Sequence, residues 1–229
     1  MNRRIRRSFA AVVVLGAAAV FVVALTTGSR NAEPTDETHV QEIEITDYQG
    51  ERLGSVDDFR ENSIRGVQII DPETYALQVD GLVSQTASLT LSELGAFSRT
   101  QKLVTIHCVE GWSVKALWEG IALSELFAVA QPTLEANTVI FHAADGYTTS
   151  LPLDFILGRN VIIADRINEA PLPPANGFPF QLVAEDKWGY KWIRWLTRIE
   201  LSDDPEYRGF WETRGYNNDG DADGPRFGN

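Results

Sequence analysis

Short apolar segments that end in turn-forming residues dominate the chain from residue 75 onward. Apolar runs of this length, bounded by Gly, Pro, Asn or Asp, are typical of β-strands. They predict strands over residues 75–83, 102–106, 137–141, 161–164 and 180–183. Residues 192–201 alternate with a period of two, which predicts another strand that carries Arg194 and Arg198 on one face.

Three similar tetrapeptides lie between these segments, at residues 91–94, 123–126 and 153–156. Each places a Ser or Asp that could act as an N-cap beside apolar residues, so each predicts the start of a short helix. Strands interleaved with short helices predict an α+β domain with mixed β-sheets.

The N-terminal 30 residues differ in character from the rest. Four arginines among residues 3–7 precede an uncharged apolar segment at residues 9–25, which predicts either a membrane anchor or a cleaved signal peptide. Arg6 and Arg7 also resemble a twin-arginine export signal. We therefore expect an extracytoplasmic protein, in the periplasm or at the cell exterior.

Composition suggests four regions along the chain. Residues 1–30 form the signal or anchor, and residues 31–58 form a polar linker and approach. Residues 59–215 hold the predicted domain. Residues 216–229 are rich in Gly, Asn and Asp and lack the register of an EF-hand, so we expect a flexible acidic tail.

Charge and cysteine content exclude several functions. Residues 31–229 carry 15 basic and 32 acidic residues, a net charge of −17 that disfavours nucleic acid as a partner. Cys108 is the only cysteine. A single thiol excludes an intrachain disulfide, a four-cysteine iron–sulfur cluster and a structural zinc knuckle.

Cys108 follows the predicted strand 102–106, in a loop that contains Gly111. Three roles remain open for its thiol. It could be a small buried apolar group. It could be a nucleophile, for which His142 is the candidate base, since His107 is its immediate neighbour and points to the opposite face of an extended chain. It could also be the single protein ligand of a metal whose cofactor supplies further sulfurs through a dithiolene.

Two long blocks resemble a known family. The segment HCVEGWSVKALWEGIALSELF at residues 107–127 resembles the cysteine-loop signature of the sulfite oxidase superfamily's molybdopterin-binding domain. The segment PLPPANGFPFQLVAEDKWGYKWIRWLTRIEL at residues 171–201 is similar to its second signature, a Pro-Pro-x-Asn-Gly turn followed by a Lys-aromatic-Gly-aromatic-Lys segment. The branch that it looks most like contains the protein-methionine-sulfoxide reductase catalytic subunit.

The resemblance implies site residues. Cys108 falls on the molybdenum ligand and the catalytic position. The positions that match cofactor contacts are Asn62, Arg65, Asn176, Gln181, Trp192, Ile193 and Arg194. Three features depart from the branch: Gln181 stands where an arginine is usual, Ala143 stands where a hydroxyl residue is usual, and the upstream block that holds Asn62 and Arg65 lacks the branch's Tyr-Glu pair. Lys187, Lys191, Arg194 and Arg198 lie within twelve residues and could serve a phosphate.

The resemblance implies a molybdenum–molybdopterin oxidoreductase of the sulfite-oxidase-type fold, with tungsten left open. We expect oxygen-atom transfer, the reduction of a small-molecule or protein-bound S-oxide or N-oxide with electrons from a membrane redox protein. Sulfite oxidation, a cofactor-free membrane-attached binding domain and a cysteine hydrolase are the alternatives.

Overall fold

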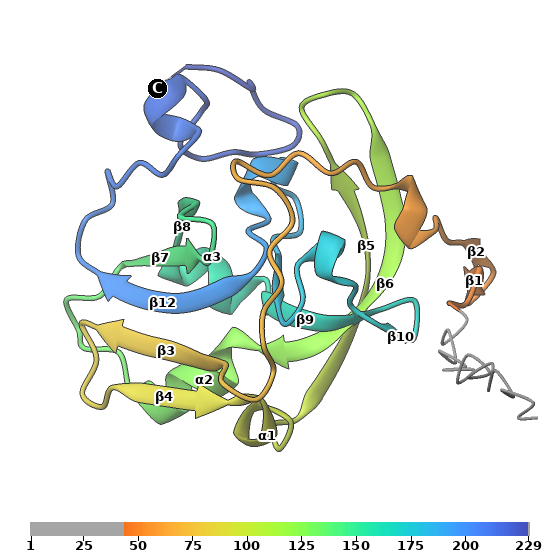
Figure 1. Ribbon diagram of the computed structural model, residues 1–229. Coiled ribbons are helices and arrows are strands. Elements are labelled where there is room, and N and C mark those ends of the chain that lie inside the picture. The colour runs from red at the N-terminus through yellow and green to blue at the C-terminus, as the bar shows by residue number, and fades with distance from the viewer. Residues whose placement is uncertain (1–43, 229) are drawn as a thin grey trace, which may run out of the picture. The chain divides into compact units, whose positions relative to one another are not determined.

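The computed structural model describes residues 44–228. Two five-stranded sheets form most of this part of the chain (Figure 1). The first has the order β10-β9-β6-β5, with β11 also paired to β9, and all its neighbours are antiparallel. Its strands are β5 (Arg99–His107), β6 (Ser113–Ala122), β9 (Ile162–Ile167), β10 (Ala170–Pro171) and β11 (Gln181–Val183).

The second sheet has the order β4-β3-β12-β7-β8. It contains β3 (Ala76–Gly81), β4 (Ala87–Thr90), β7 (Thr138–Ala143), β8 (Thr148–Pro152) and β12 (Leu196–Ser202). Strands β3 and β12 are parallel while the other neighbours are antiparallel, so this sheet is mixed. The predicted α+β class with mixed sheets and short helices is confirmed.

Short helices connect the strands. They are α1 (Leu91–Leu94), α2 (Leu123–Ala130) and α3 (Leu153–Gly158). All three begin where the tetrapeptides predicted, but the predicted caps are wrong. The true N-cap of α1 is Thr90, which forms a capping box with Glu93, and neither α2 nor α3 has a side-chain cap. A two-stranded hairpin, β1 (Asp47–Tyr48) with β2 (Glu51–Arg52), precedes the sheets.

Apolar side chains from both sheets share one core. Leu77 and Val79 of β3, Trp118 of β6, Ile163 of β9 and Ile199 of β12 are all fully buried in it. Each such side chain stabilises the fold by about 1.5–3 kcal/mol. The core therefore gives the loops at the sheet ends a rigid support.

The strand predicted over residues 192–201 is wrong in its first half. Trp195 has a φ of +51°, so the chain turns there and β12 begins only at Leu196. Because this turn breaks the period of two, Arg194 and Arg198 do not share a face. Arg198 pairs with Asp80 of the neighbouring β3, at 2.8 Å.

Long connections lie against one end of the sheets. The segment from η1 (Val56–Asp58) to β3 crosses the face of the domain, and the C-terminal segment after β12 lies at the same end as the β5–β6 turn (Figure 1). Residues 216–228 differ from the flexible tail that we predicted. They pack through bridges from Lys187 to Asp221 and from Tyr216 to Phe227, and through a hydrogen bond from Tyr190 Oη to Asn217 O.

Candidate functional site

Cys108 occupies the turn of the β5–β6 hairpin. Its N–H donates to Trp112 O at 2.9 Å, and Gly111 N–H donates to Cys108 O at 3.0 Å. Gly111 has a φ of +91°, a conformation that favours glycine. The hairpin therefore fixes the backbone on both sides of the thiol, which is itself buried.

Burial is also the main influence on the thiol's acidity. Desolvation raises the pKa of Cys108 above the usual thiol value, and the charge of Glu110 raises it further. A backbone hydrogen bond from Glu110 and the charges of Arg60 and Arg226 oppose this rise in pKa. In the protein without a metal, the thiol is therefore protonated at neutral pH.

Arg194 lies at the opposite end of the same site. It follows η3 (Gly189–Lys191), and its side chain is only 16% exposed. Its Nη1 donates to Ala175 O at 2.9 Å, and its Nη2 lies 3.4 Å from Glu61 Oε1. Burial lowers the pKa of Arg194 and the charge of Glu61 raises it, so the guanidinium remains a cation held in a fixed place.

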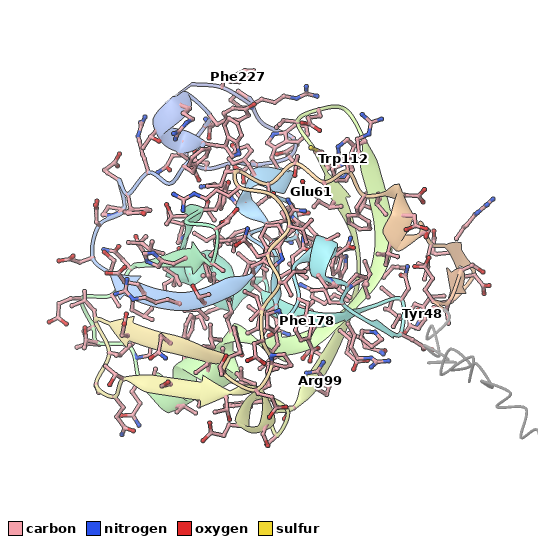
Figure 2. All side chains as sticks on the ribbon, viewed as in Figure 1. Tyr48, Glu61, Arg99, Trp112, Phe178 and Phe227 are labelled. Carbon is pink, nitrogen blue, oxygen red and sulfur yellow. The ribbon has the colours of Figure 1, made fainter. Side chains whose placement is uncertain are left out.

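Asn62 joins these two ends. Its Nδ2 donates to Cys108 Sγ at 3.9 Å, while its Oδ1 accepts from Arg194 Nη2 at 3.2 Å. The three residues come from segments far apart in sequence. Figure 2 shows Glu61, the neighbour of Asn62, on the connection that crosses toward Trp112 in the β5–β6 turn.

A cavity of about 160 Å³, partly open to solvent, contains this arrangement. Seven of the eight predicted site residues line it: Asn62, Cys108, Asn176, Gln181, Trp192, Ile193 and Arg194. Arg65 does not. Its guanidinium lies at the edge, beside Gly146, where an added Cβ would be 3.7 Å from Arg65 Cζ.

Asn176 and Gln181 are buried polar side chains, 6% and 3% exposed. Asn176 ends η2 (Pro174–Asn176), and Gln181 begins β11. Neither side-chain amide has a hydrogen-bond partner among residues 44–228, although both line the cavity. Buried amides normally find partners, so these two are suited to a polar ligand.

The predicted cluster of four basic residues is not a single patch. Lys187 pairs with Asp221, and Lys191 forms a fully buried ion pair with Glu212 at 2.7 Å. Arg198 pairs with carboxylates on the second sheet. Only Arg194 lines the cavity, because the turn at Trp195 and the fold of the C-terminal segment direct the others elsewhere.

The histidines do not support a hydrolase. His107 Nδ1 forms a hydrogen bond with Ser113 Oγ at 2.9 Å, and His142 Nε2 lies 2.8 Å from Glu200 Oε2 on the second sheet. Neither of these two histidines lines the cavity with Cys108. His39 lies outside the described residues. Within residues 44–228, Cys108 therefore has no imidazole base.

Sequence reasoning missed several residues that line the cavity. Arg60 and Tyr147 come from loops, and Trp211 and Tyr216 come from the C-terminal segment. No spacing or motif connects them to Cys108. Only the folded connections bring them to the same cavity.

Comparisons with known proteins agree with this geometry. The family described as "Oxidoreductase molybdopterin binding domain" matches residues 64–211. The chain belongs to this family. It is therefore a molybdopterin-binding oxidoreductase of the sulfite oxidase superfamily, as the two signature blocks predicted.

Two relatives and one solved structure illustrate the similarity. The oxidoreductase YuiH of Bacillus subtilis is 37% identical over 66% of this chain and 76% of its own length. YedZ1 of Azospira oryzae, provisionally named as a protein-methionine-sulfoxide reductase subunit, is 31% identical over 66% of this chain and 57% of its own length. The sulfane dehydrogenase SoxCD of Paracoccus pantotrophus shares the fold, with a TM-score of 0.58 and 23% identity over 61% of this chain and 41% of its own.

The side chains that line the cavity are of the chemical types that can bind the cofactor of this family. A pterin dithiolene leaves one position for a soft protein ligand, which a lone buried thiol can supply. The phosphate of the cofactor requires a cation, and Arg194 is the one of the four predicted basic residues that lines the cavity. The two unpartnered amides of Asn176 and Gln181 can bind the polar edges of a pterin.

Predictions about export fall outside the described residues. Arg6, Arg7 and the apolar segment 9–25 lie in the part of the chain that the structure does not describe. Within residues 44–228, no helix is long and apolar enough to cross a membrane.

Proposed function

We propose that this chain is a molybdenum-dependent oxygen-atom-transfer enzyme that reduces an S-oxide or N-oxide. The observation that carries the proposal is the connection from the Cys108 thiol through Asn62 to Arg194 within one cavity. A relative named as a methionine-sulfoxide reductase subunit supports the direction of the reaction. Tungsten in place of molybdenum is the alternative metal.

The reaction balances with two electrons and two protons. A sulfoxide loses its oxygen as the S–O bond breaks, and the products are a sulfide and water. The bound molybdenum cofactor would supply this two-electron oxygen-atom-transfer chemistry.

The chain's own residues would bind and orient that cofactor. Cys108 would give the metal a thiolate, losing the proton that burial favours in the metal-free protein. Asn62 would hold the sulfur in place through its Nδ2 hydrogen bond. Arg194 would bind the cofactor phosphate, and Asn176 and Gln181 would bind the pterin.

Trp192 and Ile193 would contribute backbone and apolar surface. The Trp192 indole donates to Lys187 O at 3.0 Å, and Ile193 O accepts from Leu182 N at 2.9 Å. These bonds fix the segment just before Arg194. Arg65 does not line the cavity, so a contact between Arg65 and the cofactor is not part of this proposal.

We further propose an extracytoplasmic location, with a membrane redox protein as electron donor. The arginines and apolar segment of the first 30 residues support this location. An enzyme held at a membrane meets its redox partner at a raised effective concentration.

Reoxidation of the reduced, cofactor-loaded enzyme tests the proposed direction. Chemically reduced enzyme should lose its reduced-metal spectrum when methionine sulfoxide, dimethyl sulfoxide or trimethylamine N-oxide is added. Cys108→Ser should abolish this response. Rapid reduction of the oxidised enzyme by sulfite, with no reoxidation by any of the three oxides, would show that the reaction is sulfite oxidation.

A further inference from the structure

Two arginines that are far apart in the sequence lie near Cys108, Arg60 in the wall of the cavity and Arg226 beside Val109. Arg60 precedes the Asn62 segment and lines the cavity together with Cys108. Arg226 belongs to the C-terminal segment, and its Nη1 donates to Val109 O, the carbonyl next to Cys108, at 3.0 Å. Both positive charges also act on the Cys108 thiol.

Both guanidiniums keep donors free for a ligand. A guanidinium has five N–H donors. Arg226 uses one of them on Val109 O, and its Cζ lies 4.8 Å from the centre of the Trp188 ring, which orients the group. Arg60 makes no hydrogen bond or ion pair with any residue in the range 44–228.

The charged side chains near Cys108 favour the binding of an anion at this end of the cavity. Glu110 is the one carboxylate that lines the cavity beside Cys108, and Trp112 Nε1 donates to its Oε2 at 3.2 Å. Asp145 also lines the cavity, but Asp145 and Glu61 both act on Arg194 at its other end. Two cations against one carboxylate leave a net positive charge at this end, in a domain that is otherwise strongly acidic.

We propose that Arg60 and Arg226 form an anion-recognising rim that selects oxide substrates carrying a carboxylate or a similar anionic group. Paired N–H donors of a guanidinium match the two oxygens of a carboxylate. The substrate's S–O or N–O group would point toward Cys108, while its anionic group would stay at the rim. This inference rests on the proposed function, and it defines the class of oxide that the site prefers.

Two probes with the same sulfoxide separate charge from reactivity. N-acetylmethionine sulfoxide carries a carboxylate, and its N-methylamide is neutral. Stopped-flow reoxidation of the reduced, cofactor-loaded enzyme gives a second-order rate constant for each. We expect the acid to react about tenfold faster than the amide, because charge-assisted hydrogen bonds at a partly solvated rim are of that strength. Added salt should reduce this preference.

Variants identify the residues responsible. Arg60→Gln and Arg226→Gln should each lower the ratio of acid to amide rates, and the double variant should bring it close to one. Arg52→Gln is the matched control, since Arg52 is exposed on β2 and does not line the cavity. Arg60→Gln removes no hydrogen bond or ion pair within residues 44–228, so we expect the variant to fold as the wild type does.

The outcomes are distinguishable. If acid and amide react equally fast, or if the preference survives in the double variant, the rim does not recognise anions, while the proposed reduction of oxides stands. If neither probe reoxidises the enzyme and no other oxide does, both proposals fail.

Discussion

Gly177 gives the most exact prediction about how the site is built. It is the last residue of the Pro-Pro-x-Asn-Gly turn and has a φ of +110°. A Cβ placed there would lie 2.9 Å from Arg194 Cβ and 3.0 Å from Arg194 Cγ. Unstrained carbon contacts are about 3.5–4.0 Å. Gly177→Ala must therefore both strain the backbone and displace Arg194.

The cost can be divided into two parts. A left-handed conformation costs an alanine about 1–2 kcal/mol, and an extra methyl group in a packed site costs about 1–3 kcal/mol more. Gly177→Ala should therefore lower the free energy of unfolding by about 2–5 kcal/mol. It should also reduce the cofactor content, since Arg194 would lose its position.

Gly50→Ala is the matched control. Gly50 has a φ of +83°, but a Cβ there meets nothing within 4 Å. Gly50→Ala should lower the free energy of unfolding only by the cost of the left-handed backbone, about 1–2 kcal/mol, and should keep its cofactor. Urea denaturation of cofactor-free protein gives the two free energies, and molybdenum analysis of loaded protein gives occupancy. Equal losses in the two variants, with full occupancy in both, would refute the packing argument.

Three further predictions follow from the same geometry. Lys191→Met leaves the buried Glu212 carboxylate without its cation and should lower the free energy of unfolding in urea by about 3–5 kcal/mol. Adding Glu212→Leu should restore most of this loss, whereas a loss below about 1 kcal/mol in Lys191→Met alone would argue against a buried pair. Burial raises the pKa of Cys108, so the rate of alkylation of the metal-free protein by iodoacetamide should keep rising above the usual thiol pKa, whereas a plateau near pH 8 would contradict that shift. The stability that this shift contributes is fully present below the thiol pKa of the unfolded protein and is lost as pH rises through the thiol pKa of the folded protein. Arg194→Ala should lose about 2–4 kcal/mol of cofactor-binding free energy and purify largely without cofactor, whereas Arg198→Ala, on the second sheet, should keep its cofactor. Full cofactor occupancy in Arg194→Ala would show that Arg194 does not bind the cofactor phosphate.

The sequence predicted elements and site residues to different extents. The five apolar runs each overlap a strand, and three tetrapeptides mark three helices, because apolar runs and turn residues act locally. The bounds near Arg194 were wrong, since the left-handed turn at Trp195 depends on contacts across the domain: its N–H donates to Gly177 O and its indole to Pro174 O. The period-two alternation of residues 192–201 does not indicate such a turn.

The site residues came from family resemblance rather than from pattern. Cys108 could be singled out as the only thiol, but nothing local indicates that Asn62 touches it or that Arg194 lies beyond. Lys187 and Lys191 form ion pairs with Asp221 and Glu212, which follow β12 in the chain, and the sequence does not indicate these pairs. Only residues 216–229, which contain Asp221, were predicted to be flexible from their polar, glycine-rich composition. The contacts of Asp221 and Glu212 with the second signature leave Arg194 as the cation of the cavity.

The central claim is that Cys108 is the protein's ligand to the metal. X-ray absorption at the molybdenum K-edge counts the sulfur ligands of the loaded enzyme directly. A dithiolene and one cysteine predict three sulfurs in the wild type and two in Cys108→Ser. The same sulfur count in both proteins, or a wild-type protein that contains no molybdenum or tungsten, would contradict the account.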